Sequence, residues 1–204
     1  MGRTSAGMLR VAHIVNSVFT SRSYILACEG RRECWLVDCG DVEPLLERME
    51  TLCGSDFRVA GVLLTHAHFD HLYGLPRLRE LFPDVAVYTN EWGRAALADE
   101  RANMSRYHEN PIRYVSDRVV VCGEGSVIDL FDGVTAEVFA VPGHNPSSLA
   151  YRVGDYLFTG DAYIPGVRVV TTLSGGDKAQ ARASLERLQA LASGCIVCPG
   201  HEVE

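Results

Sequence analysis

Residues 63–74, with the sequence LLTHAHFDHLYG, place three histidines and one aspartate directly after a run of aliphatic residues. An ordinary core gains nothing from this cluster, because buried imidazoles and carboxylates are costly unless each finds a partner. A bound divalent cation removes that cost, since imidazole nitrogens and carboxylate oxygens are ligands that zinc prefers. The stretch therefore predicts a buried strand that ends in a metal-binding loop.

The spacing within this stretch favours two metal ions over one. His66 and His68 are two residues apart, so in an extended segment their side chains project from the same side. Asp70 and His71 follow at the point where the chain turns toward a predicted helix. The alternative is a solvated polar loop in which these residues cluster by chance.

The composition predicts one globular domain in the cytoplasm. The chain has 204 residues, of which 47% are hydrophobic, so it can bury a full core. It has no apolar run of about 20 residues that would span a membrane, and residues 1–15 lack the apolar stretch of a signal peptide. The net charge of −7 and the dispersed basic residues argue against a nucleic-acid partner.

The cysteines are expected to be reduced thiols. There are seven of them, an odd number with scattered spacing and no export signal. Cys195 and Cys198 form a CxxC pair within a predicted strand, where positions three apart face opposite sides. We therefore expect two buried structural cysteines and no redox pair or zinc site.

Ten short apolar runs rich in Val, Ile, Leu and Tyr are predicted to be strands. They cover residues 11–15, 23–28, 34–39, 59–65, 85–89, 118–122, 134–141, 148–153, 156–160 and 195–200. Apolar residues spaced three or four apart predict helices at 42–52, at 75–82, and at 185–192 behind a capping Asp177. The order predicts an α/β protein with two sheets, built as one domain with halves at residues 1–125 and 126–204.

Ligand-type side chains follow four of the predicted strands. VLLT precedes the histidine loop, defined here as residues 66–71; AVPG precedes His144, LFTG precedes Asp161, and IVCPG precedes His201. Loops at the ends of neighbouring strands meet on one rim of a sheet. Each of the last three residues is a weak signal alone, but together with the histidine loop they indicate one site.

At these motifs the chain resembles the metallo-β-lactamase-fold superfamily, and within it the small glyoxalase II-like hydrolases. The matching motifs occur in family order over nearly the whole chain: LVDCGD (36–41), THAHFDH (65–71), PGHNPSS (142–148), TGDA (159–162) and CPGH (198–201). The resemblance implies an αβ/βα sandwich of two mixed sheets flanked by helices, with the site along one edge.

The resemblance also implies ligands for two divalent metal ions, with zinc expected and iron or manganese as alternatives. Asp38 matches a carboxylate that supports the histidine loop. Asp161 matches a ligand shared by both ions. The remaining ligands fall into a first set, His66, His68 and His144, and a second set, Asp70, His71 and His201.

Such a site is expected to hydrolyse a small acyl substrate. Two ions with a shared carboxylate leave room for a bridging water, whose pKa they lower toward about 7. The metal-bridging hydroxide would attack the substrate carbonyl, and Asp70 would pass a proton to the leaving group. A thioester ranks ahead of a lactone, and a β-lactam ranks behind both. The sequence has no GxSxG motif that would supply a serine nucleophile.

The chain departs from the family pattern in two places. The common Gly-His-Thr-Pro-Gly-Ser is replaced by Gly-His-Asn-Pro-Ser-Ser, so Asn145 and Ser147 add hydrogen-bonding side chains. The sequence ends three residues after His201, where glyoxalase II enzymes continue into a helical domain that holds glutathione, and we expect this chain to lack that domain. Glutathione specificity therefore does not follow from the resemblance.

Several features near the site have open interpretations. Residues 103–115 are polar and aromatic, and form either a lid over the site or a plain surface loop. Tyr163 either contacts the substrate or packs against the core. His13 and His108 belong to no motif and are expected to be ordinary strand and loop residues.

Three other functions stay open. A persulfide dioxygenase of the same fold would hold one iron with the first set and leave the second idle, and metal identity distinguishes it because zinc has no redox chemistry. Phosphodiester cleavage, as in tRNA-processing relatives, is disfavoured by the acidic composition. A non-enzymatic metal-stabilised scaffold would be expected to have lost a ligand, whereas all seven are present. The acyl group and the oligomeric state are not determined by the sequence.

Overall fold

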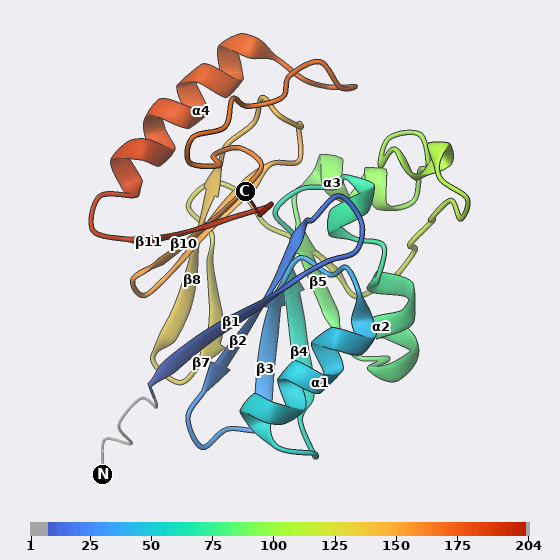
Figure 1. The fold of residues 1–204 in the computed structure, drawn as a ribbon, viewed down its shortest axis with the longest axis vertical. Helices are drawn as coiled ribbons and strands as arrows, with labels where there is room; N and C mark the ends of the chain where they lie inside the picture. Colours follow the sequence, from blue (N-terminus) through green and yellow to red (C-terminus); the bar gives the residue numbers. More distant parts are fainter. Residues whose placement is uncertain (1–7, 203–204) are drawn as a thin grey trace.

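Two β-sheets pack face to face and carry helices on both outer sides in the computed structural model, which describes residues 8–202 (Figure 1). The first sheet has six strands in chain order. They are β1 (Leu9–Val15), β2 (Arg22–Cys28), β3 (Glu33–Val37), β4 (Arg58–Leu63), β5 (Ala86–Thr89) and β6 (Val119–Val121). The pairs β1–β2 and β2–β3 are antiparallel, and the pairs from β3 to β6 are parallel.

The second sheet has five strands in the order β11-β10-β9-β8-β7. They are β7 (Val127–Phe131), β8 (Val134–Ala140), β9 (Leu149–Val153), β10 (Tyr156–Gly160) and β11 (Ile196–Pro199). The pairs from β7 to β10 are antiparallel, and β10 pairs with β11 in parallel. Both sheets are therefore mixed.

Four α-helices cover the sheets: α1 (Val42–Cys53), α2 (Leu75–Leu81), α3 (Glu91–Leu97) and α4 (Lys178–Leu191). In Figure 1, α1, α2 and α3 lie on the side of the first sheet, and α4 lies on the side of the second. Two short 3-10 helices, η1 (Phe69–His71) and η2 (Ser105–Tyr107), lie in loops. The arrangement is the predicted αβ/βα sandwich, and the three predicted helices are confirmed.

The layer between the sheets is aromatic and aliphatic. Trp35 on β3 donates a hydrogen bond from Nε1 to the Leu130 carbonyl across this layer, at 3.0 Å. Tyr151 on β9 is fully buried and donates its hydroxyl to the Leu64 carbonyl at 2.9 Å. The second sheet therefore holds the backbone just before the histidine loop.

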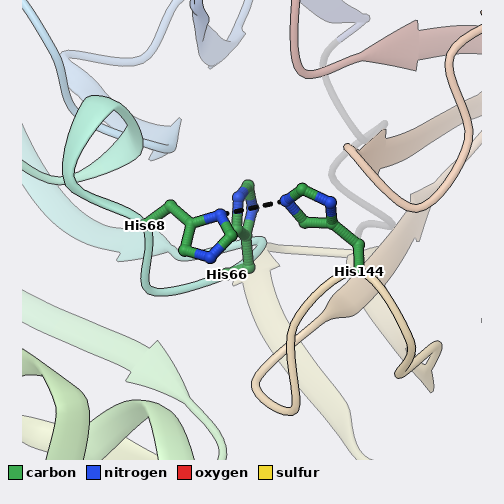
Figure 2. A group of neighbouring side chains, drawn as sticks. All are labelled: His66, His68 and His144. Atoms are coloured by element: carbon green, nitrogen blue, oxygen red, sulfur yellow. Dashed lines mark hydrogen bonds between the residues drawn. The ribbon is translucent and has the colours of Figure 1, made fainter. Parts of the chain in front are cut away.

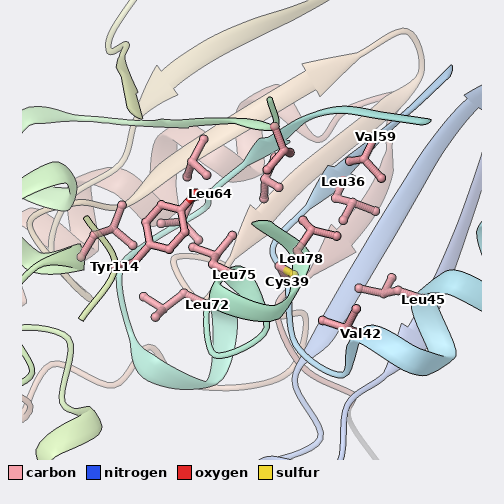
Figure 3. Close-up of a cluster of buried hydrophobic side chains, with 14 of the residues drawn as sticks. Leu36, Cys39, Val42, Leu45, Val59, Leu64, Leu72, Leu75, Leu78 and Tyr114 are labelled. Atoms are coloured by element: carbon pink, nitrogen blue, oxygen red, sulfur yellow. The ribbon is translucent and has the colours of Figure 1, made fainter. Parts of the chain in front are cut away.

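The outer layers are built from the helix faces that the sequence periodicity predicts. Figure 3 shows the cluster between the first sheet and its helices, where Val42 and Leu45 of α1 and Leu75 and Leu78 of α2 point into the core. On the other side, Leu188 of α4 packs against the second sheet. Asp177 caps α4 as expected, because its Oδ1 accepts hydrogen bonds from the amides of Ala179 and Gln180.

Cys195 and Cys198 lie on opposite sides of the second sheet, as predicted, but Cys195 precedes β11 and is half-buried, so the prediction of two buried strand cysteines is correct only for Cys198. Cys195 packs against the α4 side, whereas Cys198 is buried between the sheets. None of the seven cysteines, all of which lie within residues 8–202, forms a disulfide.

The prediction missed two elements, α3 and β7. The helix α3 has only seven residues, contains Gly93, and begins at Asn90, whose side chain accepts a hydrogen bond from the Gly93 amide. A helix this short shows barely two turns of periodicity. In strand β7 the apolar run of the sequence is interrupted by Asp129, because the strand lies at the sheet edge and exposes alternate residues. Across residues 8–202, no helix combines the length and apolarity needed to cross a membrane.

Replacing Tyr151 by Phe tests the contact between the second sheet and the backbone before the histidine loop. We expect the Tyr151→Phe variant to lose about 1 to 1.5 kcal/mol of unfolding free energy, because the buried Leu64 carbonyl loses its hydroxyl donor. Chemical denaturation followed by circular dichroism measures this loss. Tyr156→Phe is the matched control at a half-buried position on β10, and an equal effect of both variants would contradict the assignment.

Candidate metal centre

Five loops meet at one edge of the sandwich. Asp38 follows β3, the histidine loop follows β4, His144 follows β8, Asp161 follows β10, and His201 follows β11. Residues 66–71 lie between β4 and α2 and include η1, which turns Asp70 and His71 inward. The sheet topology thus brings together residues that are distant in the sequence.

The first set of predicted ligands forms a tight group. His66, His68 and His144 are buried, and each offers one ring nitrogen within 4.8 Å of the others. Figure 2 shows the three rings facing one another, with His68 Nδ1 3.0 Å from His144 Nε2. Both sheets contribute to the group, because His144 lies in the loop after β8 of the second sheet and the other two lie in the loop after β4 of the first.

The second set forms another group beside the first. Asp70, His71 and His201 offer ligand atoms within 4.8 Å of one another. The Nε2 atom of His201 lies 3.2 Å from Asp70 Oδ2 and 3.3 Å from His71 Nε2. All seven ligands predicted from the sequence therefore lie at this edge of the sandwich. Six of them form the two groups, and the seventh is Asp161.

Asp161 lies between the two groups. Its Oδ2 is 3.5 Å from His144 Nε2 and 3.2 Å from His201 Nε2, so one carboxylate faces both sets. The Oδ1 atom of Asp161 and the Nε2 atom of His66 are buried without a hydrogen-bond partner. Gly200 makes room for this carboxylate, since a Cβ there would lie 2.1 Å from Asp161 Oδ1. Two unpartnered buried ligand atoms fit a cation between them.

Every histidine of the site is anchored by the ring nitrogen that points away from the cluster. This arrangement fixes the orientation of the ring and presents the other nitrogen inward. The anchoring partners are Thr65 Oγ1 for His66 (3.1 Å), Asn145 Nδ2 for His68 (2.9 Å), Asp38 Oδ2 for His71 (2.9 Å), the Val170 carbonyl for His144 (2.8 Å) and the Phe19 carbonyl for His201 (2.8 Å).

Asp38 supports the histidine loop from behind, as the resemblance implied. Its Oδ1 accepts the Thr65 amide at 2.7 Å, and its Oδ2 lies 2.7 Å from Thr65 Oγ1 and 2.9 Å from His71 Nδ1. The backbone φ of Asp38 is +59°, a left-handed conformation that Asp tolerates better than most residues. This turn ends β3 and aims the carboxylate at the neighbouring strand end.

Asn145 and Ser147, the two departures from the family motif, act together. Ser147 Oγ accepts the Ala67 amide at 2.8 Å and donates to Asn145 Oδ1 at 2.6 Å. The amide nitrogen of Asn145 lies 2.9 Å from His68 Nε2. The loop after β8 therefore holds the centre of the histidine loop at two points, at Ala67 and at His68.

The β1–β2 hairpin completes the site from the far end of the chain. Phe19 and Thr20 both have left-handed backbones, with φ of +54° and +52°. This turn directs the Phe19 carbonyl to His201 Nδ1, and Ser21 Oγ donates to the Asp70 carbonyl at 2.8 Å. No motif in the sequence marked this hairpin as part of the site.

Electrostatics divides four of the site histidines, His66, His68, His71 and His201, into two kinds. Burial disfavours the cation at His71 and His201, but the facing carboxylates outweigh it and raise the pKa to about 9 for His71 and about 10 for His201. Burial and the other imidazoles lower the pKa of His68 to about 4 and that of His66 well below its usual value. The neighbouring imidazolium groups lower the pKa of Asp161 despite its burial. The carboxylates therefore stabilise positive charge at His71 and His201, whereas His66 and His68 are neutral imidazoles that can offer a nitrogen lone pair.

A pocket of about 390 Å³ opens onto the site. Its wall includes Met104, Tyr107 and His108, so part of the 103–115 segment borders the site. His108 was expected to be an ordinary loop residue, but its ring stacks on Phe69 with centroids 4.0 Å apart. Stacking between a loop and the histidine loop is a tertiary contact that no sequence spacing revealed.

Tyr163 does not line this pocket. It packs with Ala162, Leu157 and Leu188 in the cluster between the second sheet and α4. Its carbonyl accepts a hydrogen bond from Thr159 Oγ1 at 2.6 Å. Of the two interpretations of Tyr163, the packing role is the one that the structure shows.

Comparison with known proteins identifies the family to which this chain belongs. A model of the metallo-beta-lactamase superfamily matches residues 17–201, and the chain belongs to that superfamily. The chain is 30% identical over 198 residues to a hydroxyacylglutathione hydrolase of Hamiltonella defensa subsp. Acyrthosiphon pisum, an alignment that covers 95% of this chain and 67% of that relative. It spans 55% to 61% of the lengths of other hydroxyacylglutathione hydrolases that it matches. These findings confirm the resemblance seen at the motifs.

Solved structures agree with this assignment. The BLEG-1 B3 metallo-beta-lactamase is 28% identical, with a TM-score of 0.83 over 95% of this chain and 92% of that one. The protein TTHA1623 in a di-iron-bound form is also 28% identical, with a TM-score of 0.78 over 94% of this chain and 92% of that one. The sandwich predicted from the sequence is thus found in proteins of this superfamily.

Substituting Asp38 tests its supporting role. Asparagine also tolerates the left-handed backbone, so Asp38→Asn removes the charge and one acceptor without adding backbone strain. We expect a loss of about 2 kcal/mol in unfolding free energy, because a buried charged acceptor serves the Thr65 amide and His71. Urea unfolding measures this loss. Asp132→Asn, at an exposed position, is the control, and a similarly small change in both variants would rule out the role.

Proposed function

We propose that the protein is a dinuclear metal-dependent hydrolase of small acyl substrates, with a thioester as the expected substrate. One observation carries the proposal: Asp161 faces two complete ligand groups at once, and each group offers its ligand atoms within 4.8 Å. A structural zinc site closes one ion with four ligands of its own, whereas here two ions would lie side by side with Asp161 as a common ligand, an arrangement in which they can also share a water.

The residues present fit divalent metal ions. The donor set of five imidazoles and two carboxylates suits zinc, and it also suits iron or manganese. His66, His68 and His144 would hold one ion, and Asp70, His71 and His201 the other, with Asp161 shared. When bound, these ions supply Lewis acidity for a carbonyl oxygen and make water a stronger acid.

Asp70 is the residue that we assign to proton transfer. It is buried, lines the pocket, and lies 3.4 Å from His71 Nε2 and 3.2 Å from His201 Nε2. Burial would raise the pKa of its carboxyl, but the neighbouring imidazolium groups lower it, so the carboxylate is ionised at neutral pH. It can therefore accept a proton on the pocket side and pass it to a departing thiolate or alkoxide.

The choice of an acyl substrate draws on the relatives. Those at about 30% identity are named for the hydrolysis of a hydroxyacyl derivative of glutathione, which is a thioester. The pocket beside the site provides space for one small acyl group. A lactone and a β-lactam present the same kind of carbonyl and rank below the thioester.

The single-iron dioxygenase is the alternative. Its single iron would be held by His66, His68 and His144, and the second set would then bind no metal. The anchoring of His71 by Asp38 and of His201 by the Phe19 carbonyl counts against it, because idle side chains do not need fixed ring orientations.

Metal content is the first test of the proposal. We expect close to two ions per chain by elemental analysis after equilibration with zinc, and about one ion in His201→Ala, because His201 belongs to the second group alone. His66→Ala is expected to lose affinity as well, since that residue belongs to the first group. His13→Ala, a histidine on β1 outside both groups, is the control and should keep both ions.

Two results would contradict the dinuclear hydrolase. A single iron that survives His201→Ala would favour the dioxygenase, and no bound metal under metal-replete conditions would exclude both functions. Oxygen uptake with a persulfide substrate and thiol release from a thioester separate the two activities directly.

The Asp70→Asn variant tests the proton-transfer role. Asparagine keeps the size and one oxygen but cannot carry the proton, so we expect kcat for a thioester to fall at least about 100-fold. Thiol release is measured on samples whose metal content is determined in parallel. Asp56→Asn, an exposed residue paired with Arg32, is the control. Full activity in an Asp70→Asn sample with two ions would exclude the assignment.

A further inference from the structure

Large apolar side chains gather, unusually exposed, around the mouth of the pocket. Tyr107 is 78% exposed, Phe19 is 63% exposed and Val170 is 46% exposed. They come from three separate loops, yet all of them line this one pocket. Single exposed apolar residues are common on protein surfaces, but a group of them around the mouth of a pocket indicates a binding site for an apolar ligand.

This apolar wall begins at the metal centre itself. Phe69 lies between His68 and Asp70 in the histidine loop, and the His108 ring stacks on it. The Phe19 ring meets the edge of His108, with centroids 5.6 Å apart. The three rings form a continuous surface from the proposed ligands to the mouth, so a group bound against them extends away from the reacting carbonyl.

The outer part of this wall, formed by Phe19, Tyr107 and Val170, offers no positive charge to a substrate tail. Among the described residues that line the pocket there is no lysine or arginine, and its carboxylates belong to the proposed ligands. Lys178 lines a different hollow, beside Val169 and α4. Arg168 lines that hollow too, and it also borders a small one that shares Val170 with the pocket but does not include Phe19 or Tyr107. An anionic group held against the outer part of the wall, away from the proposed ligands, would lose its hydration without gaining a counter-ion, which is costly.

We propose that this pocket binds the acyl part of the substrate, and that the preferred acyl part is an uncharged, apolar chain of several carbons. The inference rests on the proposed function, since it names the substrate class of the same site. Each methylene removed from water by the Phe19, Phe69 and Tyr107 surface adds to binding of the transition state.

Thioesters of N-acetylcysteamine test the inference, because their leaving group is small and uncharged. The series is acetyl, butanoyl and hexanoyl, with glutaryl as an acyl group that carries a negative charge. Burial of one methylene corresponds to about a fourfold gain in kcat/KM. Hexanoyl has four methylenes more than acetyl, and burial of only two of them gives about a 16-fold gain, so we expect hexanoyl to exceed acetyl by at least about tenfold and glutaryl to fall below butanoyl.

The Tyr107→Ala variant locates the effect. Tyr107 is already exposed, so its truncation leaves the fold intact and removes only wall surface. We expect the hexanoyl-to-acetyl ratio to fall at least about threefold in Tyr107→Ala and to stay unchanged in Val127→Ala, a control on β7 that is 62% exposed and away from the pocket. An unchanged ratio in Tyr107→Ala would overturn the assignment of this wall.

Binding of product carboxylates gives a readout that does not depend on turnover. Calorimetry on the zinc-loaded protein is expected to show hexanoate binding at least about tenfold tighter than acetate, with the difference reduced in Tyr107→Ala. If acetyl or glutaryl thioesters react as fast as hexanoyl, the substrate class is wrong and the hydrolase stands. If no thioester is hydrolysed, the proposed function fails, and the ratio of the two carboxylate affinities alone decides whether the pocket is an apolar site.

Discussion

The candidate site depends on one buried carboxylate, that of Asp38. Placing a charge inside the fold is unfavourable, and burial raises the pKa of this group. The cost is offset because the Thr65 amide, the Thr65 hydroxyl and the His71 ring all lie within 2.9 Å of its oxygens. These contacts join the end of β3 to the start of the histidine loop. Two backbone hydrogen bonds add to them: the Cys39 amide donates to the His71 carbonyl at 2.9 Å, and the Leu64 amide donates to the Tyr88 carbonyl of β5 at 3.0 Å.

The second sheet supplies the other half of the support. The Leu149 amide donates to the Thr65 carbonyl at 2.7 Å, and Ser147 holds the Ala67 amide. The histidine loop is therefore held by backbone and side chains from both layers, and its geometry is set by the distance between the sheets. Support from both sheets keeps the candidate ligands in fixed positions, as a site built on rigid elements requires.

Much of this architecture could be predicted from the sequence, because strands, helix faces and ligand motifs are local patterns. The histidine loop and the strand-end residues His144, Asp161 and His201 each follow an apolar run, and the fold brings them together as expected. What could not be predicted was contact between distant loops. The role of Phe19 depends on a backbone carbonyl and a left-handed turn, and neither leaves a mark on residue type. The position of His108 could not be predicted either, because the ring on which it stacks, Phe69, lies 39 residues earlier in the sequence.

The contact between Phe19 and His201 has a consequence for how the molecule assembles. Those two residues are 182 positions apart, whereas His68 and His144 are 76 apart. Closing a longer loop costs more chain entropy, and contacts of high sequence separation form slowly. A folding chain can thus complete the two ligand groups at different stages. The first group can form once β8 has docked, whereas the second can form only after β11 has paired with β10. Under the proposed function, retention of the second metal ion would therefore report whether the whole sandwich has closed.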